Sequence, residues 1–269
     1  MAEEAGQGMS APFDLSGRVA FVSGAAGHLG RTMSQALAEA GAHVILNGRD
    51  EARLKDFEGE LRAKGHAASR AAFDVADFAA SRAFFAGLSR LDILVNNAIS
   101  MTPKPFSALE PSDFEATYAS GVTAAFEAVR AARPALVMAA QEAGEASVVN
   151  IASMYGAVSP DARIYANPDQ ASPFHYGPAK AALLQLTRHL AAELCPQHVR
   201  VNALLPGPFP KPCVTQADPA FAARLAARTM LGRTGGAEEI RGPLLFLAAK
   251  ASSFVTGAAI AVDGGWTAW

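Results

Sequence analysis

Residues 19–30 read Val-Ala-Phe-Val-Ser-Gly-Ala-Ala-Gly-His-Leu-Gly. The apolar, β-branched start predicts a buried strand, and the residues from about Leu29 to Ala40 have the three-and-four spacing of a helix. Glycine in the turn between them allows positive φ and close approach of the backbone to a ligand, and the free N–H groups at a helix start favour an anion. This order predicts a phosphate-binding turn for a dinucleotide. The alternative is an ordinary tight turn.

Strand and helix patterns continue to alternate after this turn. Further strands are predicted at 43–46, 67–73, 91–95, 147–151, 199–204 and 258–262. Between the first two of these, Asp50 can cap a helix that Gly65 ends. Seven strands in a βαβ rhythm without a linker predict a single α/β domain, a Rossmann-type, doubly wound parallel sheet flanked by helices. We expect residues 1–12, small and unpatterned, to be a mobile N-terminal tail, and residues 13–269 to be the domain.

The composition excludes several classes of function. The chain has 269 residues, 51% of them hydrophobic, with 23 Lys plus Arg against 25 Asp plus Glu. It therefore lacks the basic field that nucleic acid or an anionic membrane would need as a partner. No apolar stretch approaches the roughly 20 residues of a spanning helix, and the start lacks a signal pattern, so a cytoplasmic location is expected. Cys195 and Cys213 form no CxxC pair, so we expect neither a disulfide framework nor a metal site.

The end of the second strand indicates which dinucleotide is used. Asn47-Gly48-Arg49 stands where, about 20 residues after the glycine turn, a carboxylate would bind the adenosine ribose. Arg49 instead offers a guanidinium suited to a 2′-phosphate, which favours NADP(H). Because Asp50 and Glu51 follow directly and can reach the ribose, NAD(H) stays an alternative. The other alternative is that Arg49 is only a solvent-exposed residue at a helix start.

Two later segments carry a family resemblance. Asn150-Ile151-Ala152-Ser153 and Tyr176-Gly177-Pro178-Ala179-Lys180 resemble the Ser…Tyr-x-x-x-Lys signature of the short-chain dehydrogenase/reductase family. The similarity extends from about Leu15 to Trp266 and is closest to the compact branch, which includes gluconate 5-dehydrogenase-like and 3-oxoacyl-carrier-protein-reductase-like members. It implies that Ser153, Tyr176 and Lys180 are catalytic.

The resemblance also assigns cofactor contacts. They are Gly24, Gly27, His28, Leu29, Gly30, Arg49, Asp74, Val75, Asn97, Ala98, Tyr176, Lys180, Pro206, Gly207 and Phe209. Asp74 and Val75 would border the adenine, and Pro206, Gly207 and Phe209 would lie near the carboxamide. For Asp74 and Asn97 the alternative is that they only satisfy backbone groups at strand ends.

The chemistry of the signature can be argued from the residues themselves. Tyr176 and Lys180 are four residues apart, so on a helix they share one face. A phenol titrates near pH ~10, and a nearby ammonium or an oxidised nicotinamide would lower that pKa toward neutrality. Ser153, at the carboxyl end of a central strand, can donate a hydrogen bond to a carbonyl oxygen that gains negative charge. These groups suit hydride transfer with Tyr176 as general acid/base. The alternative is that Tyr176 and Lys180 are only two exposed side chains on the surface of an amphipathic helix.

The chain departs from the family pattern at four places. His28 stands where the family has a glycine, and Ile99 follows Asn96-Asn97-Ala98 in place of another glycine. The family's catalytic asparagine aligns with Gly121, so its water relay is in doubt, with Ser120 a neighbouring substitute. Lys211 stands where a threonine is usual.

The segment between Ser153 and Tyr176 is longer than the family's usual spacing. Both ends are anchored at expected catalytic residues, so it should lie over the substrate side. It carries a hydrogen-bonding set suited to a polyhydroxylated or acidic substrate: Tyr155, Asp161, Arg163, Tyr165, Asn167, Asp169, Gln170 and His175. The alternatives are a loop whose groups satisfy one another and a subunit contact.

We therefore expect an NADP(H)-preferring oxidoreductase that acts on a secondary alcohol or ketone of a polar metabolite, such as a sugar or sugar acid. A 3-oxoacyl-thioester reductase is the alternative within the class. A nucleotide-sugar epimerase or dehydratase with tightly bound NAD, and a catalytically silent binding protein, are the alternatives outside it. The resemblance implies a homotetramer in which helices from about 112 to 141 and 176 to 194 pair across subunits, although the apolar face of the second helix could be intrachain core.

Overall fold

The sheet of this protein places the carboxyl ends of its central strands side by side. The computed structural model describes residues 12–167, 169 and 171–269. In these residues seven parallel strands are arranged in the order β3-β2-β1-β4-β5-β6-β7. They are β1 (Val19–Val22), β2 (His43–Gly48), β3 (Ala68–Ala72), β4 (Ile93–Asn96), β5 (Ala146–Ile151), β6 (Val199–Pro206) and β7 (Ala259–Val262). The order reverses between β1 and β4, and the crevice at such a switch point is where parallel sheets bind ligands.

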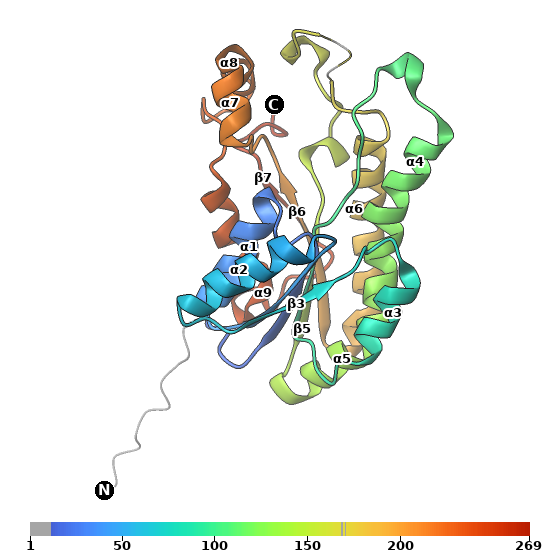
Figure 1. Cartoon of the computed structure of the whole chain (residues 1–269), viewed down its shortest axis with the longest axis vertical. Coiled ribbons are helices and arrows are strands. Elements are labelled where there is room, and N and C mark those ends of the chain that lie inside the picture. Colours follow the sequence, from blue (N-terminus) through green and yellow to red (C-terminus); the bar gives the residue numbers. More distant parts are fainter. Residues whose placement is uncertain (1–11, 168, 170) are drawn as a thin grey trace, which may run out of the picture.

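The central strands β4, β5 and β6 consist mostly of apolar residues. Every residue of β4, β5 and β6 is buried, as parallel strands covered by helices require. Helices α1 (His28–Glu39), α2 (Glu51–Ala63) and α9 (Arg241–Ala248) pack on one face through a cluster that includes Leu37, Phe57 and Leu244. Helices α3 (Phe78–Ala86), α4 (Pro111–Tyr118), α5 (Ala124–Ala143) and α6 (Tyr176–Leu194) cover the other face (Figure 1). The predicted three-layer α/β fold is thereby confirmed.

The remaining helices are short. Helices α7 (Pro212–Ala217) and α8 (Pro219–Ala227) follow β6 and lie beyond its carboxyl end (Figure 1). Single 3₁₀ turns occur at Phe106–Ala108, Met154–Gly156, Ala162–Ile164, Cys195–Gln197, Ala237–Ile240 and Lys250–Ser252. The predicted N-cap of α2 is confirmed, since the Asp50 carboxylate accepts a hydrogen bond from Arg53 N at 3.1 Å.

One helix differs from its expected form. The helix predicted from about 112 to 141 is divided into α4 and α5 by a π-helical turn, Ala119–Thr123, which contains Gly121. No helix of the described residues is long and apolar enough to cross a membrane. The prediction of a mobile tail falls on residues 1–11, which lie outside the described residues, and on Pro12, whose carbonyl accepts a hydrogen bond from Ala251 N.

Candidate active site

The glycine turn is held tightly against the end of β4. Gly24 has φ +65, a conformation that favours glycine, and a Cβ on Gly30 would overlap the Gly24 carbonyl oxygen. The Asn97 amide donates to the carbonyls of Ser23 at 2.9 Å and Gly24 at 3.3 Å. Asn97 therefore does satisfy backbone groups, and in doing so it fixes the shape of the turn.

A groove runs along the carboxyl ends of β1, β2 and β4. It is a cavity of about 260 Å³ and contains seven of the predicted cofactor residues: Gly24, Gly27, Arg49, Asp74, Val75, Asn97 and Ala98. Asn47, Ile99, Ser100 and Ser120 also line it. Residues from five separate segments of the chain thus meet in one depression, as the doubly wound topology requires.

The end of the groove at β2 carries charge and an unsatisfied acceptor. The Arg49 guanidinium is largely exposed and lies 3.7 Å from the Asp74 carboxylate. Asn47 is fully buried, and its amide donates to the carbonyls of Ala71 at 2.9 Å and Phe73 at 3.2 Å. Within the described residues its Oδ1 has no hydrogen-bond partner. A buried acceptor without a partner is unfavourable, and a donor in the groove would relieve it.

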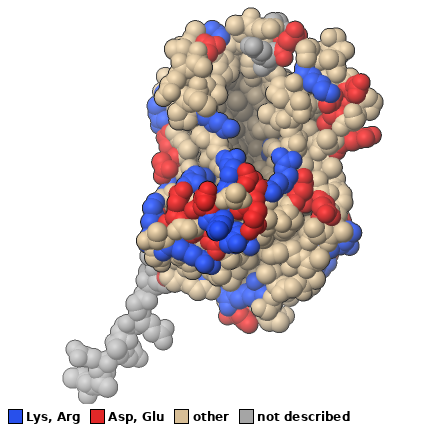
Figure 2. Space-filling model, in the orientation of Figure 1, with Lys and Arg blue, Asp and Glu red and all other residues tan. Residues whose placement is uncertain are grey.

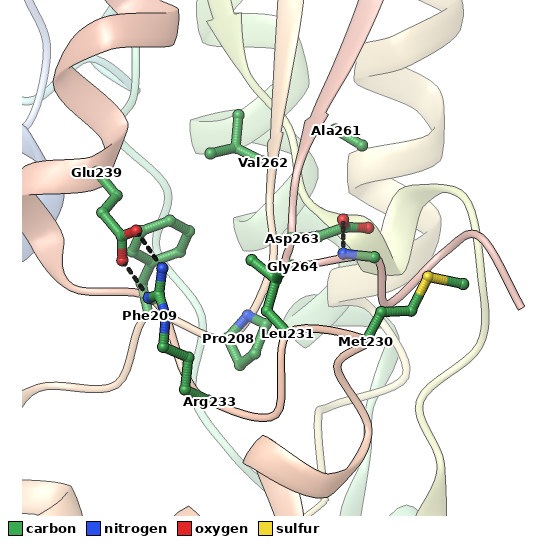
Figure 3. A pocket seen from close by; sticks show the side chains of 12 residues that line it. Pro208, Phe209, Met230, Leu231, Arg233, Glu239, Ala261, Val262, Asp263 and Gly264 are labelled. Atoms are coloured by element: carbon green, nitrogen blue, oxygen red, sulfur yellow. Dashed lines mark hydrogen bonds and ion pairs between the residues drawn. The ribbon is translucent and has the colours of Figure 1, made fainter.

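The predicted contacts around the segment after β6 do not line the groove. His28, at the start of α1, reaches across to this segment, with Nε2 3.1 Å from the Phe209 carbonyl oxygen. The Phe209 ring faces the other way and packs on Gly235, where an added Cβ would stand 2.7 Å from Cε1. It lines a separate cavity of about 430 Å³ beside the paired Arg233 and Glu239 (Figure 3). The Leu29 side chain packs against the hydrophobic core. The groove is therefore lined by neither the Phe209 ring nor the Leu29 side chain.

The three predicted catalytic residues lie at the carboxyl end of β5. Ser153 follows that strand and is buried, and its hydroxyl accepts a hydrogen bond from Tyr155 N at 3.1 Å. Tyr176 is the first residue of α6, and Lys180 follows one turn later. The Lys180 ammonium donates to the Ile151 carbonyl at 2.6 Å and lies 5.7 Å from the centre of the Tyr176 ring. The predicted shared face of Tyr176 and Lys180 is therefore present.

Burial shifts the pKa values of both titratable groups. It lowers the pKa of the buried Lys180 ammonium to about 8, because the charged form is poorly solvated. Burial also raises the pKa of the Tyr176 phenol, and a hydrogen bond with the Ser153 hydroxyl offsets part of that rise. In the protein without a dinucleotide, burial outweighs the hydrogen bond with Ser153, so Tyr176 is protonated at neutral pH. A protonated Tyr176 can act as a proton donor.

Comparison with known proteins identifies the family. The family described as "Enoyl-(Acyl carrier protein) reductase" matches residues 24–267. The chain belongs to the short-chain dehydrogenase/reductase family. The predicted enzyme class, an NAD(P)-dependent oxidoreductase acting on alcohol groups, is confirmed with it.

Similar members of the short-chain dehydrogenase/reductase family have different substrates in their names. "Rhamnolipids biosynthesis 3-oxoacyl-[acyl-carrier-protein] reductase" of Pseudomonas aeruginosa is 34% identical, over 94% of this chain and 98% of that protein. Gluconate 5-dehydrogenase of Gluconobacter oxydans is also 34% identical, over 95% of this chain and 96% of that protein. A crystal structure of a gluconate 5-dehydrogenase from Burkholderia cenocepacia, in complex with NADP and tartrate, superimposes with a TM-score of 0.84. Its identity is 32%, and the match covers 96% of this chain and 98% of that one. The prediction of NADP agrees with that complex.

The long segment before Tyr176 uses most of its polar groups internally. The Asp161 carboxylate binds the Arg163 guanidinium through two contacts of 2.9 Å, and the hydroxyls of Tyr155 and Tyr165 are 3.2 Å apart. Asn167 Oδ1 accepts a hydrogen bond from Asp169 N at 3.0 Å, and Gln170 lies outside the described residues. These contacts match the alternative in which the polar groups of the loop form hydrogen bonds and ion pairs with one another.

The same segment is also docked onto the end of the chain. Met154 and Ile164 form a small buried cluster with Leu225 of α8 and with Trp266. The loop and α8 therefore bound the same space, and Figure 2 shows a hollow on that side of the molecule whose visible walls are largely free of charged residues. Lys211 is exposed at the start of α7.

Sequence reasoning gave no role to two of the groups that connect the site. Thr117, in α4, and His175, named only as a polar loop residue, are both buried and lie 2.9 Å apart through Oγ1 and Nδ1. His175 stands between Pro173-Phe174 and Tyr176, and this local sequence indicates no particular partner for its side chain. Thr117 comes close to it only because α4 packs against α6 in the fold.

Proposed function

We propose that this protein transfers hydride between NADP(H) and a secondary alcohol or ketone of a polar metabolite, such as a sugar acid, with Tyr176 as general acid/base. The observation that carries the proposal is the position of Ser153, Tyr176 and Lys180 at the carboxyl end of β5. This strand pairs with β4, whose carboxyl end leads into the groove. Membership of the short-chain dehydrogenase/reductase family and the resemblance to gluconate 5-dehydrogenases support it.

The groove fits a dinucleotide with a 2′-phosphate. The close packing of Gly24 and Gly30 leaves backbone N–H groups at the start of α1 for a pyrophosphate, and Arg49 supplies an exposed cation at the other end. The partnerless Asn47 Oδ1 offers an acceptor there. When bound, NADP(H) supplies the hydride donor or acceptor. The protein's residues then have only to hold the substrate and to move its proton.

The proton chemistry follows from the burial of the site. During reduction Tyr176 donates its phenolic proton to the carbonyl oxygen as negative charge develops there, while the Ser153 hydroxyl donates a hydrogen bond to the same oxygen. Lys180 is fixed by the Ile151 carbonyl one turn from the phenol, and its positive charge stabilises the phenolate that remains. In the reverse direction the phenolate accepts the proton of the alcohol.

One group of side chains near the site favours a substrate with a carboxylate. The Trp266 ring packs edge-on to Tyr155 at 6.4 Å, and the Arg228 guanidinium lies 5.6 Å from the centre of that same indole. Arg228, which is paired with the Asp161 carboxylate at 3.5 Å, adds a cation to a cluster that also holds two phenolic hydroxyls, Tyr155 and Tyr165. Hydroxyls and a guanidinium are suited to a hydroxy acid.

A second candidate is a 3-oxoacyl-thioester reductase. A cavity of about 810 Å³ lies beside the start of α6 and is lined in part by Phe106, Val158, Pro160 and Phe174. Its apolar lining suits a hydrocarbon chain better than a polyol. The named activity of the Pseudomonas relative supports the same reading.

We further infer a cytoplasmic homotetramer. Phe126 and Met138, on the outer face of α5, are each more than 40% exposed, and burial of such side chains favours association. Sedimentation velocity of the purified protein tests the assembly, and a monomer would contradict it.

The test of the proposed function is a substrate panel with NADPH and NADH. We expect reduction of keto-sugar acids with NADPH, and loss of at least 100-fold of that activity in Tyr176→Phe. Tyr118→Phe, a half-buried tyrosine of α4, is the matched control and should keep wild-type activity. Preference for a 3-oxoacyl thioester would select the second candidate, and equal rates for wild type and Tyr176→Phe would refute the mechanism.

A further inference from the structure

His175 connects the start of α6 to two other segments. Its side chain is fully buried directly before Tyr176. Nδ1 lies 2.9 Å from the Thr117 hydroxyl in α4, and Nε2 lies 3.3 Å from the Thr102 carbonyl oxygen, in the segment after β4. Because a carbonyl only accepts, Nε2 carries a proton in this arrangement. One ring thus joins three pieces of chain that are distant in sequence.

The connection continues to the wall of the groove. The Thr117 hydroxyl lies 3.0 Å from the Ser100 carbonyl, and Ser100 N donates to the Ser120 hydroxyl at 2.9 Å. Ser100 and Ser120 both line the groove proposed for the dinucleotide. His175, the residue directly before Tyr176, is therefore linked through Thr117 to the segments of Ser100 and Ser120, which bound the groove.

The first turn of α6 needs such an external support. His175 occupies the N-cap position with φ −76 and ψ −18, and its side chain makes no capping hydrogen bond to the helix. An uncapped helix start leaves N–H groups without intrahelical partners and frays more readily. Tyr176 is the first residue of that turn, so its position depends on contacts outside the helix. The His175 ring supplies part of them, beside the packing of Gly177 on the Tyr155 backbone. The Phe114 ring, whose centre lies 5.8 Å from that of the imidazole, packs against it.

We propose that His175, acting through Thr117 and Thr102, is a positioning residue that holds the Tyr176 phenol in register with the groove. The proposal rests on the proposed function, in which Tyr176 exchanges a proton with the substrate. A displacement of about 1 Å at a reacting group is enough to reduce a rate by 10²-fold. A weakened link should therefore slow the chemical step while leaving the Arg49 end of the groove unchanged.

The test uses four variants of the full-length protein. His175→Ala removes both contacts, whereas His175→Asn keeps an amide group near the position of Nδ1 that can hydrogen-bond to the Thr117 hydroxyl. Thr117→Val removes the hydroxyl at nearly constant shape. Thr123→Val makes the same exchange at an exposed threonine of the π-helical turn and is the control. For each variant we would measure kcat and KM for NADPH and ketone, and the isotope effect with 4-deuterated NADPH.

We expect kcat to fall at least tenfold in His175→Ala and in Thr117→Val, with KM for NADPH within twofold of wild type. The isotope effect on kcat should rise, since hydride and proton transfer become more rate-limiting. His175→Asn should recover to within about threefold of wild type. Partial unfolding would lower the active fraction without changing the isotope effect.

Unchanged kcat in His175→Ala, an unchanged isotope effect, or equal losses in His175→Asn and His175→Ala would overturn the positioning role. The proposed function is tested separately by Tyr176→Phe. If Tyr176→Phe is inactive while His175→Ala behaves as wild type, only the positioning role fails.

Discussion

The side chain of Ile99 occupies the space above Gly121. A Cβ added to Gly121 would stand 2.8 Å from Ile99 Cδ1 and 3.0 Å from Cγ1. The two residues are also two of the departures from the family pattern, in which a glycine stands at the first position and an asparagine at the second. The two departures are complementary in space, because the Ile99 side chain fills volume that a side chain at position 121 would need.

This contact predicts that mutations at positions 99 and 121 have coupled effects on the free energy of unfolding. Gly121→Asn alone should destabilise the fold by about 1–3 kcal/mol, because the new side chain overpacks against Ile99. Combining it with Ile99→Gly should recover at least half of that loss. Urea unfolding of the wild type, both single variants and the double variant gives the coupling energy, which for residues in contact reaches about 0.5–3 kcal/mol. Strictly additive effects would show that the two positions are independent.

A second prediction concerns the choice of dinucleotide. Arg49→Ala should weaken NADPH binding by about 10- to 100-fold, the effect of losing one charge-assisted contact, and leave NADH binding unchanged. Asp74→Asn should instead tighten NADPH binding, since the carboxylate 3.7 Å from Arg49 competes with a phosphate for the guanidinium. Fluorescence titration measures both. Lys55→Ala, an exposed cation of α2, is the control for a general change of charge. Equal weakening of NADPH and NADH by Arg49→Ala would contradict the assignment.

The sequence predicted those features that depend on local pattern and chain order. The strand at 19–22, the helix at 176–194 and the order of βαβ units follow from periodicity, and the topology then gathers Gly24, Asp74 and Asn97 in one groove. The direction of the Phe209 ring could not be predicted, because it depends on the absence of a side chain at Gly235, a residue 26 positions later. The π-helical turn that contains Gly121 was likewise not predicted from the sequence.

A third prediction follows from the burial of Lys180. Its pKa of about 8 in the folded protein lies below the unfolded value of 10.5, so the unfolded chain binds more protons between these two pH values. Stability should therefore rise with pH in that window. Relative to Lys180→Met, the wild type should gain about 2 kcal/mol in free energy of unfolding between pH 7 and pH 9.5. Urea unfolding of both proteins at the two pH values measures the difference. A pH-independent difference would show that the ammonium is not desolvated.

The last prediction uses two glycines with opposite surroundings. A Cβ on Gly207 would stand 2.5 Å from Asp263 Cα, at the point where the chain after β6 lies against the backbone after β7. Because backbone atoms cannot move aside easily, Gly207→Ala should destabilise the protein by about 1–3 kcal/mol. Gly59 lies exposed within α2, and nothing stands within 4 Å of an added Cβ there. Gly59→Ala should stabilise the protein by about 0.5–1 kcal/mol, the helix preference for alanine over glycine. Thermal unfolding of the two variants beside the wild type should therefore give midpoints on opposite sides of it. A midpoint of Gly207→Ala at or above that of the wild type would contradict the close contact of Gly207 with Asp263, and a lowered midpoint of Gly59→Ala would contradict the open surroundings of Gly59.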